Sequence, residues 1–207
     1  MSKGLTNIGN TCYMNSALQC LLHLPILSSD NEDLVSDITK KSNRSDFNLM
    51  KEWIRLHQEM WGEGDETVVS TRPIFMEFLR RCQKDNVYFE SFAQNDAQEF
   101  ITLFVDFLHH SIKRKVRIEI SGEPQTEYDR IKIESIISWK RFFESNYSYI
   151  INSFYSRMIS STSCPECNYV TKNHEPISTI TLTLEEEYTS LYDCLDEFTS
   201  ETSLDSD

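Results

Sequence analysis

Residues 4–25 read GLTNIGNTCYMNSALQCLLHLP, and the rest of the chain is interpreted from this stretch. Two glycines allow the backbone to bend before a helix, which we expect to begin near Asn10 or Thr11 because both residues are good N-caps. The leucines that follow recur at helical spacing and predict one apolar face. The pattern therefore places Cys12 in the first turn of a helix.

A cysteine in that position is a candidate nucleophile. The free N–H groups and the positive dipole end of a helix N-terminus favour the thiolate, which is the form that attacks a carbonyl carbon. The turn would also return the side-chain amide of Asn7 towards Cys12, where it could donate to an oxyanion together with the Cys12 backbone N–H. Taken alone, a cysteine at a helix start is more often a small buried hydrophobe, and Cys20 and Cys82 are interpreted in that way.

The whole string favours the nucleophile. Residues 4–25 closely resemble the cysteine box of the ubiquitin-specific proteases, the papain-like deubiquitinases, and residues 94–100, QNDAQEF, are similar to the family's Q-x-D-A-x-E-F segment. The resemblance implies a thiol protease of the ubiquitin conjugation pathway. Such an enzyme hydrolyses the isopeptide or peptide bond after the C-terminal glycine of ubiquitin, here with Cys12 as nucleophile and Asn7 in the oxyanion hole.

The second segment has a local interpretation and a functional one. Taken alone, it is the acidic first turn of a helix. By resemblance Asp96 contacts the extended C-terminal tail of ubiquitin, and Gln94, Gln98 and Glu99 are further substrate-binding candidates. Carboxylates suit a tail that carries arginines, because arginine pairs with a carboxylate through charge-assisted hydrogen bonds.

The third motif is Cys164-Pro165-Glu166-Cys167. A lone C-x-x-C is half of a zinc site, a redox pair or a coincidence. The resemblance implies the family's fingers subdomain, in which a second C-x-x-C, missing here, completes the site. We therefore expect Cys164 and Cys167 as metal ligands, with His174 as a candidate third. No cofactor is expected to be required for catalysis, and a structural zinc would have an incomplete ligand set.

None of the five histidines lies in a sequence like the G-H-Y context of the family's catalytic base. The resemblance places that histidine, and its Asp or Asn partner, beyond residue 207. Three alternatives therefore stay open. The chain is a catalytically impaired fragment that acts as a ubiquitin-binding or scaffolding module, a zinc-ribbon interaction module in which Cys12 only packs, or one half of a split enzyme whose separate partner chain supplies the missing palm.

The resemblance implies an α+β fold, a truncated papain-like ubiquitin-specific protease domain. A helical thumb would occupy residues 1–115, and the start of the β-rich fingers and palm would occupy residues 116–207. The apolar patterns predict helices within 47–60, 74–81 and 94–115, strands at 116–120 and 179–184, and a closing helix at 190–198 whose N-cap is Ser190. Strands near 148–160 and 177–184 are expected to leave exposed edges.

Composition narrows the classes of partner. The 207 residues carry a net charge of -13, which repels phosphate backbones and anionic lipid, so nucleic-acid and membrane partners are not expected. The N-terminus has no apolar signal region, which indicates a reducing compartment, and the six cysteines are therefore interpreted as free thiols, a nucleophile or metal ligands rather than as disulfides. These points predict an intracellular protein, cytoplasmic and/or nuclear, with ubiquitin or ubiquitinated proteins as partners.

Overall fold

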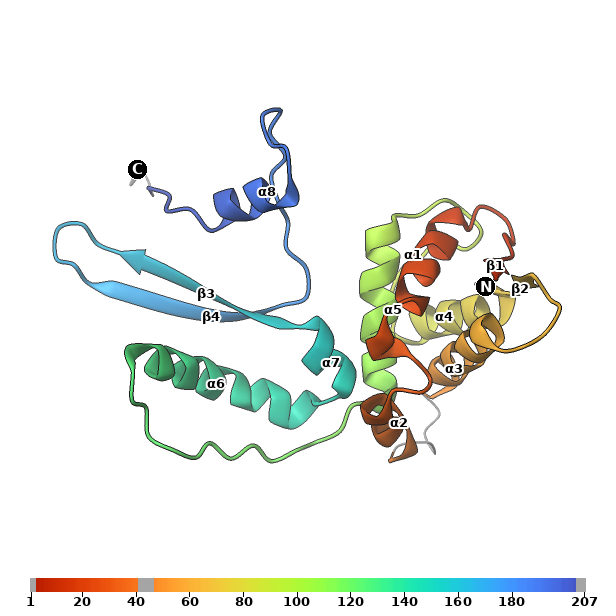
Figure 1. Ribbon diagram of the computed structural model, residues 1–207, viewed down its shortest axis with the longest axis horizontal. Coiled ribbons are helices and arrows are strands. Elements are labelled where there is room, and N and C mark those ends of the chain that lie inside the picture. Colours follow the sequence, from red (N-terminus) through yellow and green to blue (C-terminus); the bar gives the residue numbers. More distant parts are fainter. Residues whose placement is uncertain (1–2, 41–46, 204–207) are drawn as a thin grey trace. The chain divides into compact units, whose positions relative to one another are not determined.

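The computed structural model describes residues 3–40 and 47–203, and the chain forms two compact units (Figure 1). The first unit covers residues 1–154 and the second covers residues 155–207. The predicted thumb boundary at residue 115 falls inside the first unit. The mixed helix-and-strand class expected from the sequence is confirmed.

The first unit is mainly helical. Its two short strands, β1 (Gly4–Leu5) and β2 (Val68–Val69), form a parallel pair. Its helices are α1 (Cys12–Leu22), the 3₁₀ helix η1 (Pro25–Leu27), α2 (Glu32–Thr39), α3 (Asn48–Trp61), α4 (Arg72–Lys84), α5 (Ala97–Ile112), α6 (Glu127–Asn146) and α7 (Tyr149–Phe154). No helix within residues 3–40 and 47–203 is long and apolar enough to cross a bilayer.

Helix α5 lies at the centre of the core of the first unit and falls within the helix predicted at 94–115. It packs against α1, α3, α4 and α7, because its apolar stripe is wide enough to contact several partners (Figure 1). Phe100 and Phe104 of α5 stack on each other, and both rings contact Phe78 of α4. The largest fully buried side chains belong to α1, α3, α4, α5, η1 and α2: Trp53, Phe75, Phe78, Phe100, Phe104, Met14, Leu18, Leu22, Leu27, Leu34, Met50 and Leu56.

Helix α6 lies in residues 116–207, which the sequence predicts to be mainly β, so this prediction is wrong for that segment. Residues 116–120 form no strand, although Val116 bonds through its backbone N–H to the Glu144 carbonyl at 3.0 Å. The 20 residues that follow Thr126 are helical, and a capping box between Thr126 and Asp129 starts them. The alternating residues 116–120 bond to Glu144 of α6 instead of to a strand.

The second unit contains an antiparallel hairpin and one helix. Strand β3 (Ser156–Ser163) pairs with β4 (Val170–Ile177), and α8 (Leu191–Phe198) begins with the predicted Ser190 capping box. The strand predicted at 179–184 is wrong, since these residues form no strand in the structure. The helical spacing of Leu191, Cys194 and Phe198 predicts one inward face, but within residues 155–203 only Cys194 is buried, so this prediction is wrong for Leu191 and Phe198.

His109 links the stability of the first unit to pH. Its side chain is buried and its Nδ1 lies 2.7 Å from Ser148 Oγ, and burial, helped by the neighbouring His110, lowers the pKa of His109 to about 4. The unfolded chain binds this proton near pH 6.5, so stability should fall as the pH drops from 6.5 towards 4. From pH 7 to 5 the expected loss through His109 is about 2 kcal/mol, measured by urea unfolding.

A hydrogen bond to Asp106 raises the pKa of His110, so this neighbour has the opposite effect on stability. Its charged form stabilises the fold at low pH, and that contribution is lost as the pH rises through its folded pKa. Because the lowered pKa of His109 causes the decline between pH 7 and 5, His109→Gln should flatten it. An unaltered slope in His109→Gln would contradict the assignment.

Candidate active site

The cysteine turn has the predicted form. Cys12 is the first residue of α1 and is exposed, and Thr11 is the N-cap. The backbone turns at Gly9 and Asn10, whose φ angles are 111° and 52°. Glycine and asparagine tolerate this left-handed region, so the sequence NIGNTC can reverse direction just before the helix.

The start of the helix has no capping side chain. Thr11 Oγ1 accepts from the Ile8 N–H at 3.2 Å and donates to Asn7 Oδ1 at 3.1 Å, rather than accepting from an N–H of α1. The first turn of a helix normally has its N–H groups satisfied by such a cap. Among the described residues no side chain caps this end, so the positive end of the helix dipole is open to another acceptor.

Asn7 is oriented by hydrogen bonds to one end of its amide. Asn7 Oδ1 accepts from the Gly9 N–H at 3.1 Å, the Thr11 N–H at 3.4 Å and the Thr11 hydroxyl at 3.1 Å. Since the oxygen is held inside the turn, Nδ2 is the end of the amide that remains for donation. This arrangement fits the predicted oxyanion role, for which a fixed donor is needed.

The loop before the cysteine is fixed to the body of the first unit. Thr6 Oγ1 donates to the Val69 carbonyl at 3.1 Å, and Thr71 Oγ1 donates to the Thr6 carbonyl at 3.0 Å. Asn15 Nδ2 donates to the Thr6 carbonyl at 3.1 Å. These bonds join the loop to β2, to the start of α4 and to α1, so the turn that presents Asn7 is rigidly supported.

The QNDAQEF segment lies beside the cysteine turn. Asn10 Nδ2 donates to the Phe92 carbonyl at 3.1 Å, Asn95 Nδ2 donates to the Tyr13 hydroxyl at 3.2 Å, and the rings of Tyr13 and Phe100 meet edge to face. Burial raises the pKa of Tyr13, which therefore stays a neutral hydroxyl partner. The positioning role of Asn95 was not predicted, although the residue lies inside the quoted motif.

Asp96 is the N-cap of α5. Its Oδ1 accepts from the Gln98 N–H at 2.6 Å and the Glu99 N–H at 3.2 Å, so the local interpretation of this acidic turn is correct. The residue is also exposed, as are Gln94, Gln98 and Glu99, and Gln98 Nε2 bonds to Thr102 Oγ1 at 3.3 Å. The cap uses one carboxylate oxygen of Asp96, and the substrate role of all four residues stays a prediction.

The C-x-x-C motif forms the turn that follows β3. The Cys164 N–H donates to the Tyr169 carbonyl at 2.9 Å, and the Asn168 N–H donates to the Cys164 carbonyl at 2.9 Å. Backbone N–H groups of Cys167 and Glu166 lower the pKa of Cys164, which favours the thiolate that binds metal.

His174 does not complete this site. Val170 pairs with Ser163, the residue before Cys164, and His174 is four residues further along β4, which is about 13 Å of strand. In the part of the chain that the structure describes, no three His, Cys, Asp or Glu residues gather as a metal site would require. The two cysteines therefore do not fit a four-ligand zinc by themselves.

Four of the five histidines have hydrogen-bond partners, whereas the buried Nδ1 of His174 has none among the described residues. His23 Nδ1 donates to the Gln19 carbonyl at 2.7 Å, His57 Nδ1 lies 3.0 Å from Ser29 Oγ, and His110 Nδ1 bonds to the Asp106 carbonyl at 2.9 Å. His109 bonds to Ser148, and His174 lies on β4 in the other unit. None of these bonds involves Cys12. All six cysteines are free thiols; Cys82 is buried as interpreted above, whereas Cys20 is exposed, so its interpretation as a buried hydrophobe is wrong.

Comparison with known proteins identifies the fold family. The family described as ubiquitin carboxyl-terminal hydrolase matches residues 3–200. The chain belongs to this family. Its curated relatives include ubiquitin carboxyl-terminal hydrolase 2 of Bos taurus, which is 30% identical over 208 residues, 99% of this chain and 34% of the relative. Usp2 of Drosophila melanogaster is 30% identical over 99% of this chain and 21% of its own length.

A solved structure supports the same fold. The SAGA Ubp8/Sgf11/Sus1/Sgf73 DUB module bound to ubiquitin aldehyde contains a chain with a TM-score of 0.62 and 23% identity to this one. The match covers 99% of this chain and 40% of that chain. This chain therefore spans about a third of the Bos taurus relative and less than half of the structural neighbour.

Proposed function

We propose that this chain is part of a cysteine-type deubiquitinase that hydrolyses the bond after the C-terminal glycine of ubiquitin, with Cys12 as nucleophile. One observation carries the proposal: an exposed cysteine begins an uncapped helix, and the amide of Asn7 is held in the adjacent turn by three hydrogen bonds. The family relationship agrees with it, and the structural neighbour was solved with ubiquitin aldehyde.

The chemistry follows from the turn. The Cys12 thiolate attacks the glycine carbonyl carbon, and the carbonyl oxygen becomes an oxyanion that accepts from the Cys12 N–H and Asn7 Nδ2. The C–N bond then breaks, the amine leaves with a proton, and water hydrolyses the resulting thioester. A base must take the thiol proton and return it to the amine. Because the hydrogen bonds of this chain's histidines do not involve Cys12, we infer that the base comes from another segment or from a separate chain that supplies the palm.

The proposal is tested with a ubiquitin–fluorophore amide on this chain together with the segment or separate chain that supplies the base. We expect turnover that disappears in Cys12→Ala, with Cys20→Ala as the matched control because Cys20 is also an exposed cysteine of α1. A ubiquitin bearing a C-terminal electrophile should form a covalent adduct at Cys12. Equal turnover in Cys12→Ala would defeat the proposal.

The second candidate is a non-hydrolytic ubiquitin-binding or scaffolding module, and the structural partners of the histidines favour it. This candidate predicts no turnover, no dependence on Cys12, and measurable binding of ubiquitin by titration calorimetry. Turnover by the purified chain that is lost in Cys12→Ala would exclude it.

We propose that a zinc ion bound at the C-x-x-C motif would have a structural role and no catalytic one. Cys164 and Cys167 would supply two thiolates, and the remaining ligands would come from outside the described residues. The second unit buries one side chain within residues 155–203, so a covering segment that also brings ligands would stabilise its apolar residues. Metal analysis of the purified chain should give less than one zinc per molecule.

The variant Asp96→Asn separates the two roles of Asp96, which are to cap α5 and, as we propose, to bind the ubiquitin tail. Asparagine keeps an oxygen that can cap α5, so the midpoint of urea unfolding should change little, since asparagine and aspartate are similar N-caps. Loss of the charge should raise KM for the ubiquitin substrate by about threefold to tenfold if the carboxylate meets an arginine. Asp85→Asn, also near a helix end and exposed, is the matched control. An unchanged KM in Asp96→Asn would restrict Asp96 to capping.

A further inference from the structure

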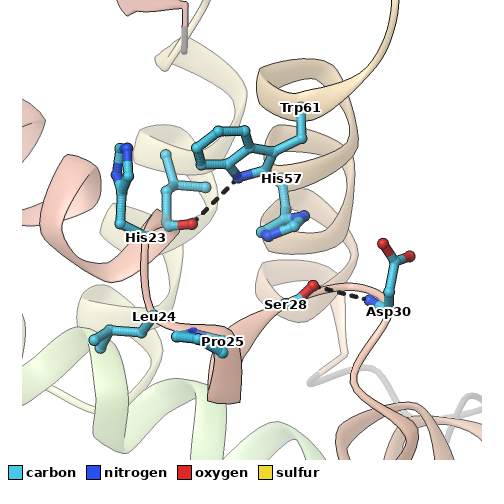
Figure 2. A pocket seen from close by; sticks show the side chains of 8 residues that line it. His23, Leu24, Pro25, Ser28, Asp30, His57 and Trp61 are labelled. Atoms are coloured by element: carbon cyan, nitrogen blue, oxygen red, sulfur yellow. Dashed lines mark hydrogen bonds between the residues drawn. The ribbon is translucent and has the colours of Figure 1, made fainter. Parts of the chain in front are cut away.

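A pocket of about 300 Å³ lies at the opposite end of α1 from Cys12 (Figure 2). It is formed where the end of α1, η1 and the last turns of α3 meet. His23 is eleven positions after Cys12, which is about 16 Å along the helix axis, so the pocket is distinct from the cysteine turn. Its lining consists of Leu22, His23, Leu24, Pro25, Ser28, Asp30, His57 and Trp61.

Three aromatic rings are fixed around this pocket. Trp61 Nε1 donates to the Leu22 carbonyl at 3.2 Å, which holds the indole in place while 45% of the residue stays exposed (Figure 2). The His23 ring meets Trp61 edge to face, with centroids 5.0 Å apart, and the His57 ring lies 6.3 Å from Trp61. An exposed tryptophan held by a hydrogen bond offers a flat ring at little entropic cost to a ligand.

The polar groups at the pocket are acidic or neutral. Asp30 is exposed, and its backbone is fixed by the bond from its N–H to Ser28 Oγ at 3.2 Å (Figure 2). No ion pair of Asp30 is found among the residues that the structure describes. His57 is buried and burial lowers its pKa, so its imidazole is neutral at physiological pH and does not repel a cation. The lining contains no lysine or arginine, and the whole chain carries a charge of -13.

We propose that this pocket binds an arginine side chain of a partner polypeptide. The guanidinium group is planar, stacks on aromatic rings and forms hydrogen bonds with a carboxylate, so it matches Trp61 and Asp30 together. Leu24 and Pro25 would contact the aliphatic stem, as apolar surfaces do with long cationic side chains. The proposal is independent of the catalytic function, since no residue of the pocket belongs to the cysteine turn.

The test uses N-acetyl-arginine amide as the probe and the indole N–H signals of the chain in ¹H–¹⁵N NMR spectra at pH 7.5. The three tryptophans give three signals, and Trp61→Phe identifies the one from Trp61. We expect the arginine probe to shift the Trp61 signal saturably and to leave the buried Trp53 unchanged. N-acetyl-citrulline amide, which has nearly the same shape without the charge, should need about tenfold higher concentration.

Variants test the carboxylate. Asp30→Asn should weaken the arginine probe by about threefold to fivefold, since the pair is exposed. Asp65→Asn removes the same charge from an exposed residue outside the lining and should leave binding unchanged. An unmoved Trp61 signal, equal binding of citrulline, or equal binding of N-acetyl-lysine amide would each overturn the assignment to arginine.

Discussion

Asn7→Asp is expected to lower kcat/KM for the ubiquitin–fluorophore amide by about 100-fold to 1000-fold, the usual effect of losing one oxyanion donor. Aspartate has nearly the shape of asparagine, and its oxygen can still accept from the Gly9 N–H, the Thr11 N–H and the Thr11 hydroxyl. It lacks the N–H donor and places a negative charge where the oxyanion forms. The change therefore removes the catalytic group while the turn is retained.

Two further variants make this result specific. Asn7→Ala removes the accepted bonds as well, so it should lower both turnover and the midpoint of urea unfolding, whereas Asn7→Asp should lower turnover alone. Asn86→Asp makes the same chemical change at an exposed asparagine outside the cysteine turn and should leave kcat/KM unaltered. If Asn7→Asp had the kcat/KM of the wild type, the side-chain amide of Asn7 would have only a structural role.

The geometry of the cysteine turn was predictable because its determinants are local. Asn10 and Thr11 indicate the helix start, and the residues that bend the chain are close in sequence. The Asp96 cap and the Ser190 capping box follow from the same local rules. The contact of Asn95 with Tyr13 was not predictable, since it joins residues 82 positions apart.

The sequence predictions were wrong in the second unit, where side chains with an apolar pattern are exposed rather than buried. Residues 179–184 alternate as a strand does, but an alternating segment needs a partner strand and an apolar layer to form one. Within the described residues of the second unit, 179–184 pair with neither β3 nor β4 and no apolar layer covers them, and Leu184 is 82% exposed and Leu191 is 64% exposed. The apolar pattern of these residues therefore indicates which side chains are suited to burial. It does not show that this chain alone buries them.

Phe100→Ala should destabilise the first unit by about 3–5 kcal/mol, because it removes a fully buried aromatic ring and leaves a cavity. The ring contacts Tyr13 of α1, Phe78 of α4 and Phe104 of α5. The surrounding helices cannot close the gap together, since each is held by other contacts. Because native domains have about 5–15 kcal/mol of stability, this loss should move the midpoint of urea unfolding far towards zero with an unchanged m value.

Tyr88→Ala is the control for this variant, since its ring is 83% exposed and its loss should change stability by less than about 0.5 kcal/mol. Phe100 also lies beneath Tyr13, the neighbour of Cys12, so under conditions where Phe100→Ala remains folded its turnover should fall as the cysteine turn loses support. A Phe100→Ala protein with the wild-type midpoint would show that α1, α4 and α5 do not share one core, and the placement of Cys12 beside the Asp96 turn would lose its physical basis.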